Sequence, residues 1–177
     1  MNTRSALRGL LVASALVLGA AAATTRHFWL VDGARPVHSG ESLRPISLRS
    51  TDGSAVSLGR RPGHAMLINV FATWCTPCRD EVPALSRAAA RLRSAGTDVV
   101  GIDQAEDAQR ATRFALLYKL DYPIYVDDDL QTQHVLGAHV IPETIFVNAK
   151  GIVTSINVGP LDEAGFLALG RADGSTE

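Results

Sequence analysis

Both cysteines of the 177-residue chain lie in one stretch, FATWCTPCRDEVP (71–83), and its surroundings limit what the chain can fold into. A continuous apolar run, HAMLINVF (64–71), leads into this stretch and predicts a central strand that is buried on both faces. Apolar residues then recur at spacings of three and four along 76–94, which predicts an amphipathic helix. Cys75 and Cys78 therefore sit where a buried strand ends and a helix begins.

Strands and helices alternate along the rest of the chain. Two short apolar segments joined by Asp52-Gly53 predict a β hairpin near the start of the folded region. Asp129 is expected to cap a short helix that ends at Leu136. The other predicted elements are a helix at 107–120, a final helix at 161–169, and strands at 97–103, 122–127, 143–148 and 152–158. This order predicts an α/β protein whose mostly parallel sheet ends in antiparallel strands.

The N-terminus has the pattern of an export signal. Arg4 and Arg8 precede an almost uncharged stretch, 9–25. This stretch is shorter than the ~20 residues of a membrane-spanning helix, so a cleaved signal and a retained anchor both fit. Either one places the following residues outside the cytoplasm, where disulfides persist. The chain is thus expected to contain an export signal or membrane anchor (1–25), a linker (26–43), a folded domain (44–170) and a flexible tail (171–177).

The composition indicates a globular domain and gives no basis for binding nucleic acid. Hydrophobic residues make up 46% of the chain and charged residues 20%, which is typical of a protein that folds around a core. The net charge of -1 leaves no excess of basic residues to attract a phosphate backbone. Neither a G-x-G-x-x-G pattern nor a P-loop is present in the sequence, so no phosphate-binding motif points to a nucleotide.

Three kinds of site could use a C-x-x-C pair: a metal centre, a structural disulfide and a redox dithiol. A structural zinc site draws on four ligands, and a Cys2His2 site with His134 and His139 is one alternative. A disulfide between Cys75 and Cys78 would close a loop of only two intervening residues, so it would constrain the unfolded chain very little. The position of the pair favours the redox interpretation, because a C-x-x-C beside a βαβ pattern is a redox signature.

A helix start is a favourable place for a reactive cysteine. The unpaired N–H groups and the positive end of the helix dipole stabilise a thiolate there, which makes Cys75 the expected nucleophile. Cys78 lies one turn later, within reach of the first sulfur. Pro77 suits the first helical turn, where its missing N–H needs no partner. Trp74 provides a flat apolar surface that can cover the pair or pack in the core.

These residues resemble the thioredoxin superfamily, and most closely its exported TlpA/ResA/CcmG branch of thiol–disulfide oxidoreductases. The resemblance covers about 43–169 and rests on three stretches, which are STDGSAVSL (50–58), LINVFATWCTPCRDEVPAL (67–85) and LGAHVIPETIFVNAKGIV (136–153). It implies a thioredoxin-like three-layer sandwich with a mixed central sheet and an added N-terminal β hairpin.

The resemblance also implies roles for individual residues. It implies a cis peptide bond before Pro142, beside the dithiol, with Ile141 offering backbone hydrogen bonds to a bound partner strand. Glu81 falls on the glutamate of the family's C-x-x-C-x-x-E-x-P pattern. Thioredoxins proper carry a buried aspartate at the position of Asn69, which cannot titrate. Glu81, raised in pKa by partial burial, is therefore expected to exchange the proton of Cys78.

The activity that the resemblance implies is the reduction of selected protein disulfides on the periplasmic or extracytoplasmic face of the cell membrane. The sequence PET (142–144) is similar to that of members in cytochrome c maturation, which implies apocytochrome c as a substrate and a membrane thiol protein as reductant. No metal or organic cofactor is implied. The alternatives are a metal-binding chaperone that uses Cys75, Cys78 and a histidine such as His139, and a thiol peroxidase on the same fold.

Overall fold

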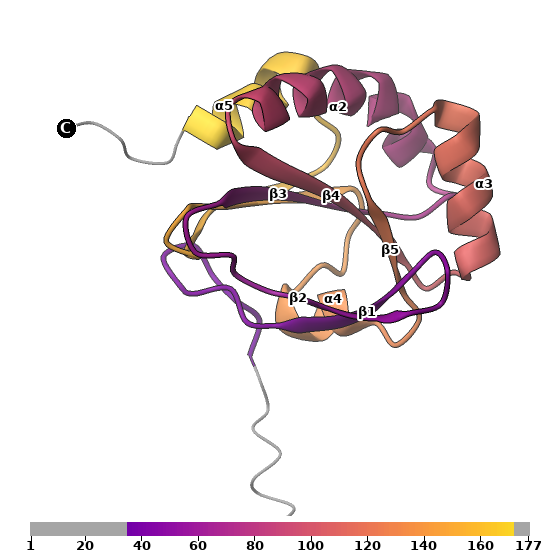
Figure 1. Ribbon diagram of the computed structural model, residues 1–177, viewed down its shortest axis with the longest axis horizontal. Coiled ribbons are helices and arrows are strands. Elements are labelled where there is room, and N and C mark those ends of the chain that lie inside the picture. Colours follow the sequence, from indigo (N-terminus) through magenta and orange to yellow (C-terminus); the bar gives the residue numbers. More distant parts are fainter. Residues whose placement is uncertain (1–34, 172–177) are drawn as a thin grey trace, which may run out of the picture. The chain divides into compact units, whose positions relative to one another are not determined.

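The computed structural model describes residues 35–171, so the predicted export segment (1–25) and the end of the predicted tail (172–177) lie outside the described residues. Within this range seven strands form one sheet in the order β2-β1-β5-β4-β3-β6-β7 (Figure 1). The strands are β1 (Ile46–Ser50), β2 (Ala55–Leu58), β3 (Ala65–Phe71), β4 (Thr97–Gln104), β5 (Ile124–Asp127), β6 (Glu143–Val147) and β7 (Val153–Val158).

The sheet is mixed, as predicted. Strands β3, β4 and β5 run parallel to one another at its centre. The β1–β2 hairpin joins β5 in antiparallel pairing on one side, and β6 and β7 extend β3 in antiparallel pairing on the other. The predicted thioredoxin-like sandwich with an added hairpin is therefore confirmed.

Helices cover both faces of the sheet. Helix α2 (Thr76–Ser94) packs against α5 (Glu163–Arg171) over the centre of the sheet, and α3 (Ala108–Tyr118) lies beside them over β5 (Figure 1). The short α4 (Gln131–Val135) lies on the opposite face, against β1. The crossover from β4 through α3 to β5 thus adds a parallel strand and a helix next to the cysteine pair.

Strand β3 organises the core. All of its residues after Ala65 are buried, which agrees with the prediction of a strand covered on both faces. Met66, Ile68 and Val70 point to the face of α4, whereas Leu67 and Phe71 pack beneath α2. Because side chains alternate along a strand, Asn69 also lies on the α2 side. This alternation places a polar group directly beneath the helix that carries the cysteines.

Part of the predicted linker packs against the domain. Val37 and Leu43 are buried in the core cluster on the α4 face. The Val37 N–H donates to the Val135 carbonyl at 2.8 Å, and Ser42 forms a bridge with Ile152. The folded body therefore includes residues 35–43, which extends it beyond the predicted start at residue 44.

The cap of α4 differs from the expectation. Asp129 is exposed and makes no side-chain capping hydrogen bond with α4. The buried Asp127, at the end of β5, takes that role: its carboxylate accepts from the Gln131 N–H at 2.7 Å and the Thr132 N–H at 2.8 Å. The prediction that Asp129 caps this helix was therefore wrong. The residue at which β5 ends fixes which carboxylate faces the start of α4, and that residue is Asp127.

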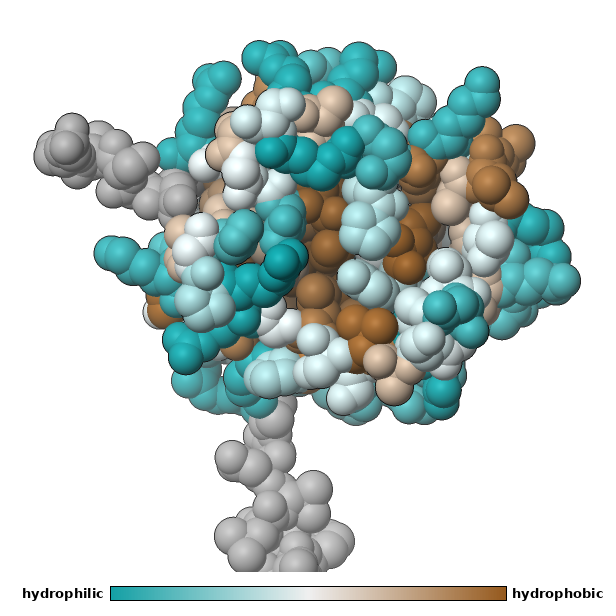
Figure 2. Space-filling model, in the orientation of Figure 1, coloured by the Kyte–Doolittle hydropathy of each residue, from teal (hydrophilic) through white to brown (hydrophobic). Residues whose placement is uncertain are grey.

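Hydrophobic atoms gather in the middle of the face that Figure 2 shows, between the central strands and the β1–β2 hairpin. A cavity of about 610 Å³ lies between this hairpin and the first residues of β3, β4 and β5. Residues that line it include Val56, Leu58, Met66, Val99 and Tyr125. Among residues 35–171, no helix is both long enough and apolar enough to cross a bilayer.

Candidate active site

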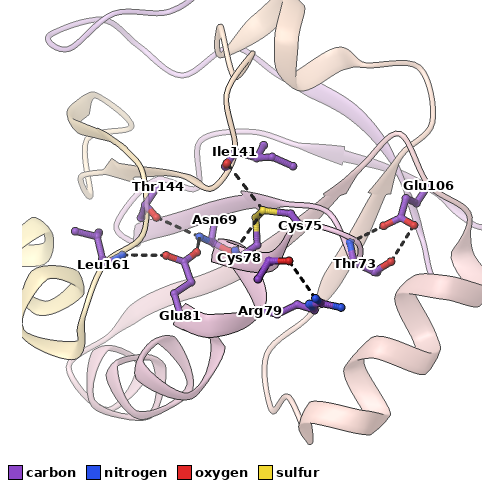
Figure 3. Close-up of a disulfide and its surroundings, with 11 residues drawn as sticks. Asn69, Thr73, Cys75, Cys78, Arg79, Glu81, Glu106, Ile141, Thr144 and Leu161 are labelled. Carbon is purple, nitrogen blue, oxygen red and sulfur yellow. Dashed lines mark hydrogen bonds between the residues drawn. A yellow bond between two sulfur atoms is a disulfide. The ribbon is translucent and has the colours of Figure 1, made fainter.

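The cysteine pair lies where the sequence predicts it, at the start of α2 (Figure 3). Cys75 is the N-cap residue of this helix, and its sulfur accepts a hydrogen bond from the Cys78 N–H at 3.2 Å. The two cysteines form a disulfide, and their side chains are almost fully buried. Pro77 stands in the first turn, as expected. The helix start thus directs an N–H group at the first sulfur, which is where a thiolate would be stabilised.

The loop before β6 faces the disulfide. The Ile141-Pro142 peptide bond is cis, which confirms the bond geometry expected at this position. The carbonyl oxygen of Ile141 lies 3.9 Å from the sulfur of Cys75, and Figure 3 shows it directed toward the disulfide. The segment at 141–142 therefore forms one wall of the site.

Exposed apolar side chains border the same loops. Trp74, which directly precedes Cys75, is 63% exposed, and Val140, which directly precedes Ile141, is 59% exposed. Of the two interpretations of Trp74, core packing is therefore wrong.

Glu81 lies beneath the dithiol, three residues after Cys78 and buried on the sheet side of α2. Its carboxylate accepts from the Asn69 amide at 2.9 Å and from the Leu161 N–H at 3.0 Å (Figure 3). Burial raises the pKa of Glu81 above its ordinary value, although both hydrogen bonds oppose the shift. The burial that the sequence predicts for Glu81 is therefore observed.

Three further buried carboxyl groups near the site were not singled out from the sequence. Glu143 follows the cis proline, and burial raises its pKa to about 7. Asp103, at the end of β4, has a pKa raised to about 8 by burial and by neighbouring Glu106. Glu143 lies in the PET sequence, Asp103 is the last residue of the strand predicted at 97–103, and Glu106 follows that strand. Carboxylates at or just after the end of a predicted parallel strand were a signal that could have found Asp103 and Glu106.

The described residues give little support to a metal site. Among residues 35–171, no group of three or more His, Cys, Asp or Glu side chains lies close enough together to hold a metal ion. His139 is exposed, and both cysteines are engaged in the disulfide.

The fold and the disulfide at the helix start define a thioredoxin-fold redox protein. The family comparison agrees, since the Redoxin family matches residues 38–169. The chain belongs to the Redoxin family.

Similar proteins carry names of the same kind. The chain is 25% identical over 149 residues to the thiol-disulfide oxidoreductase ResA of Bacillus subtilis, covering 84% of this chain and 83% of that protein. It is 34% identical to the thiol:disulfide interchange protein DsbE of Pseudomonas fluorescens, covering 72% of this chain and 62% of that protein.

A solved structure, that of a secreted thiol-disulfide isomerase from Corynebacterium glutamicum, superimposes with a TM-score of 0.65 at 26% identity. The match covers 74% of this chain and 85% of that protein. With the family match and the disulfide, these relatives make the protein an enzyme of the thiol–disulfide oxidoreductase class.

Proposed function

We propose that the protein reduces disulfides of extracytoplasmic proteins through Cys75 and Cys78. In the reduced enzyme the Cys75 thiolate attacks one sulfur of the partner's disulfide, the other sulfur leaves as a thiolate, and a mixed disulfide forms. Cys78 then loses its proton and attacks the Cys75 sulfur, which releases the partner's second thiolate and closes the Cys75–Cys78 disulfide. The partner gains two electrons and two protons, so another dithiol must reduce the enzyme for the next cycle.

Glu81 is proposed to take the proton of Cys78. It lies on the same helix, one turn after Cys78, and is buried beside Asn69, which has no proton to exchange. A carboxylate whose pKa is raised by burial can accept a proton and return it at a higher pH than an ordinary glutamate. This role is supported by the position of Glu81 and by the direction of its pKa shift.

The substrate is proposed to lie across the loops that border the disulfide. An extended partner strand that pairs with the backbone of Ile141, beside Pro142, would be held against the Cys75 sulfur, because the Ile141 carbonyl lies 3.9 Å from it. Trp74, directly before Cys75, and Val140, directly before Ile141, are exposed and offer apolar contacts. Backbone pairing with apolar rim contacts suits an unfolded or extended polypeptide.

The proposed location is the periplasmic or extracytoplasmic face of the cell membrane. Support comes from the signal-like segment at 1–25, which as a retained anchor would tether the domain, and from the resemblance to exported proteins. The similar isomerase from Corynebacterium glutamicum is described as secreted. The sequence PET (142–144) favours apocytochrome c among the possible substrates, with a membrane thiol protein as electron donor. No contact with nucleic acid is part of the proposal.

The observation that carries the proposal is the place of Cys75, at the N-cap of α2 and against the Ile141 carbonyl. Its test uses an oxidised peptide with the C-x-x-C-H sequence to which haem is attached in c-type cytochromes. The reduced Cys78→Ser variant should form a lasting mixed disulfide with this peptide, and Cys75→Ser should not. Mixed disulfides with both variants in equal amounts would contradict the assigned roles.

The same test can address the substrate separately. A control peptide carries its disulfide between cysteines that are far apart in sequence. If Cys78→Ser captured only the control peptide, the roles of the cysteines would stand and the proposed substrate would be wrong.

A further inference from the structure

Two carboxyl side chains come together on the flank of the site opposite Glu81. Asp103 is fully buried at the end of β4, where it aligns with Phe71 of β3 and Val126 of β5. Phe71 and Val126 belong to the apolar cluster that also contains both cysteines. Glu106 follows in the turn that leads into α3, and its side chain is 2% exposed. The pair thus lies at the edge of the core that supports the dithiol.

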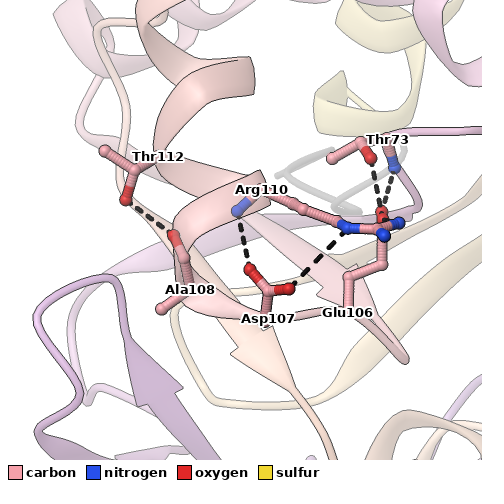
Figure 4. Close-up of polar contacts among 6 residues, drawn as sticks. All are labelled: Thr73, Glu106, Asp107, Ala108, Arg110 and Thr112. Atoms are coloured by element: carbon pink, nitrogen blue, oxygen red, sulfur yellow. Dashed lines mark hydrogen bonds and ion pairs between the residues drawn. The ribbon is translucent and has the colours of Figure 1, made fainter.

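Glu106 holds the loop that carries Cys75. Its carboxylate accepts from the Thr73 N–H at 2.5 Å and from the Thr73 hydroxyl at 2.8 Å (Figures 3 and 4). Arg110 of α3 donates to the same carboxylate at 3.3 Å. Burial opposes the ionisation of Glu106, but the hydrogen bonds from Thr73, Asp103 and Arg110 together outweigh it and keep the pKa of Glu106 below its ordinary value. An ionised Glu106 therefore fixes the backbone two residues before Cys75.

No hydrogen-bond donor among the described residues serves the side chain of Asp103. Neither carboxyl oxygen receives a hydrogen bond of ordinary geometry from any described residue, and the nearby Thr73 N–H is directed at Glu106. The remaining partner of Asp103 is the carboxylate of Glu106. Two carboxylates cannot hydrogen-bond to each other unless one carries a proton. A fully buried carboxylate without a donor is also strongly disfavoured, so Asp103 is the protonated member.

The geometry points to Asp103 and Glu106 as a proton-sharing pair that positions the redox loop. Protonated Asp103 donates a hydrogen bond to Glu106. Glu106 in turn holds Thr73 and so positions the two residues that follow it, Trp74 and Cys75. Both are positioning residues, since neither contacts the sulfur atoms in a recorded interaction. The inference rests on the proposed attack at Cys75 and adds a requirement for a neutral Asp103.

Among the described residues, the charged side chains around the pair come from α2, from α3 and its N-cap, and from the end of β5. From α3, Arg110 contacts Glu106, and Asp107 contributes a negative charge near Asp103 while forming an ion pair with Arg110 at 3.7 Å. From α2, Arg79 donates to Thr76 and lines the same surface cavity as Thr73, Arg110 and Arg113. The carboxylate of Asp127, at the end of β5, is occupied by the start of α4. Glu81 lies on the opposite flank, and Glu143 of β6 pairs with Val70, so that its side chain falls on the α4 face of the sheet.

The arrangement predicts how the loop responds to pH. Asp103 remains protonated below its pKa of about 8, and there the pair carries a single negative charge. As the pH rises through this value, a second buried charge appears beside Glu106. This charge repels an anion that approaches Cys75 and removes the donor from Glu106, so the attack of a thiolate on the disulfide becomes slower above pH 8.

The test measures reduction of the oxidised protein by 2-mercaptoethanol from pH 6 to 9.5, with each rate divided by the concentration of thiolate. In the natural protein the corrected rate constant should fall by about threefold to tenfold across pH 8, which is the order of effect of one charge at roughly 10 Å in a protein. Asp103→Asn keeps a donor and stays neutral, so its corrected rate constant should not fall. Asp107→Asn is the matched control, because asparagine still caps α3, and the fall should persist in it.

A second measurement follows the hydrogen bond from the Thr73 N–H to Glu106 directly. Hydrogen exchange of the Thr73 amide should show protection that decreases above pH 8 in the natural protein and remains constant in Asp103→Asn. Glu106→Gln leaves a neutral acceptor, so the protection should be about fivefold to tenfold lower at every pH, the usual difference between a charged and a neutral partner.

Three results would overturn the inference. In the first, the corrected rate constant of Asp103→Asn falls across pH 8 as much as that of the natural protein. In the second, this fall is absent from Glu143→Gln and present in Asp103→Asn. The third is a Thr73 amide whose protection is the same in all variants. If 2-mercaptoethanol failed to reduce the disulfide at all, the proposed function would fail, while Thr73 exchange would still decide whether the carboxyl pair holds the loop.

Discussion

At the scale of single residues, Glu81 offers the clearest test of proton transfer. Because burial raises its pKa, Glu81 is protonated below that value and ionised above it, so the exchange rate should show an inflection above pH 4.5, the ordinary value for glutamate. Glu81→Gln removes the titrating group, so we expect this inflection to disappear and the rate to fall by about 100-fold, the lower range for general acid–base catalysis. Stopped-flow measurement of disulfide exchange against pH provides the readout.

The neighbouring Asp80 supplies a control for Glu81 on the same helix. It is exposed and makes no recorded contact with the site, so Asp80→Asn should leave both the rate and its pH dependence as they are in the natural protein. A pH profile that is the same in Glu81→Gln and in the natural protein would assign the proton transfer to water or to another group.

At the scale of elements, the start of α4 depends on one carboxylate. The oxygens of Asp127 accept from two backbone N–H groups and from the Thr132 hydroxyl, all in a site with 1% exposure. Asp127→Ala leaves these donors unpaired, so we expect unfolding free energy to fall by about 2–4 kcal/mol. Asp129→Ala, two residues away and exposed, should change it by less than about 0.5 kcal/mol. Chemical denaturation of the two variants makes the comparison, and equal losses would contradict the assignment.

The same element shows what the sequence could and could not predict. Strand β3 and helix α2 were predicted because their apolar spacing is local and strong. The choice between Asp127 and Asp129 depends on where β5 ends in the sheet, which local spacing does not contain. The position of Asp103 at the end of a predicted strand could have marked it as a candidate, but its burial depends on strands and a helix that meet only after folding.

At the scale of the whole molecule, the fold and the main site follow from motifs that are far apart in the chain. The stretches at 67–85 and 136–153 together predicted the cysteine pair, the cis bond before Pro142 and the burial of Glu81. They did not predict the carboxyl pair Asp103 and Glu106 on the other flank of the dithiol, because the crossover through α3 carries no recognisable motif. The part of the site that positions Thr73 comes from this crossover.

The arrangement of charges also predicts the direction of the redox chemistry. Strong oxidants of this fold owe their potentials, about -120 mV, to a stabilised reduced form, whereas reducing thioredoxins lie near -270 mV. Here Glu81 lies on one flank of the dithiol and Glu106 lies on the other, and both are buried (Figure 3). Carboxylates in these positions disfavour a Cys75 thiolate and therefore the reduced form.

We therefore expect the potential of the Cys75–Cys78 couple to lie closer to about -270 mV than to about -120 mV. Equilibration with defined ratios of reduced and oxidised dithiothreitol, followed by thiol alkylation and mass measurement, gives the value. The oxidised protein should correspondingly resist denaturant at least as well as the reduced protein, because a low potential means that the folded structure favours the disulfide. A potential near about -120 mV, with a reduced protein more stable than the oxidised one, would make the enzyme an oxidant and reverse the proposed direction of electron flow.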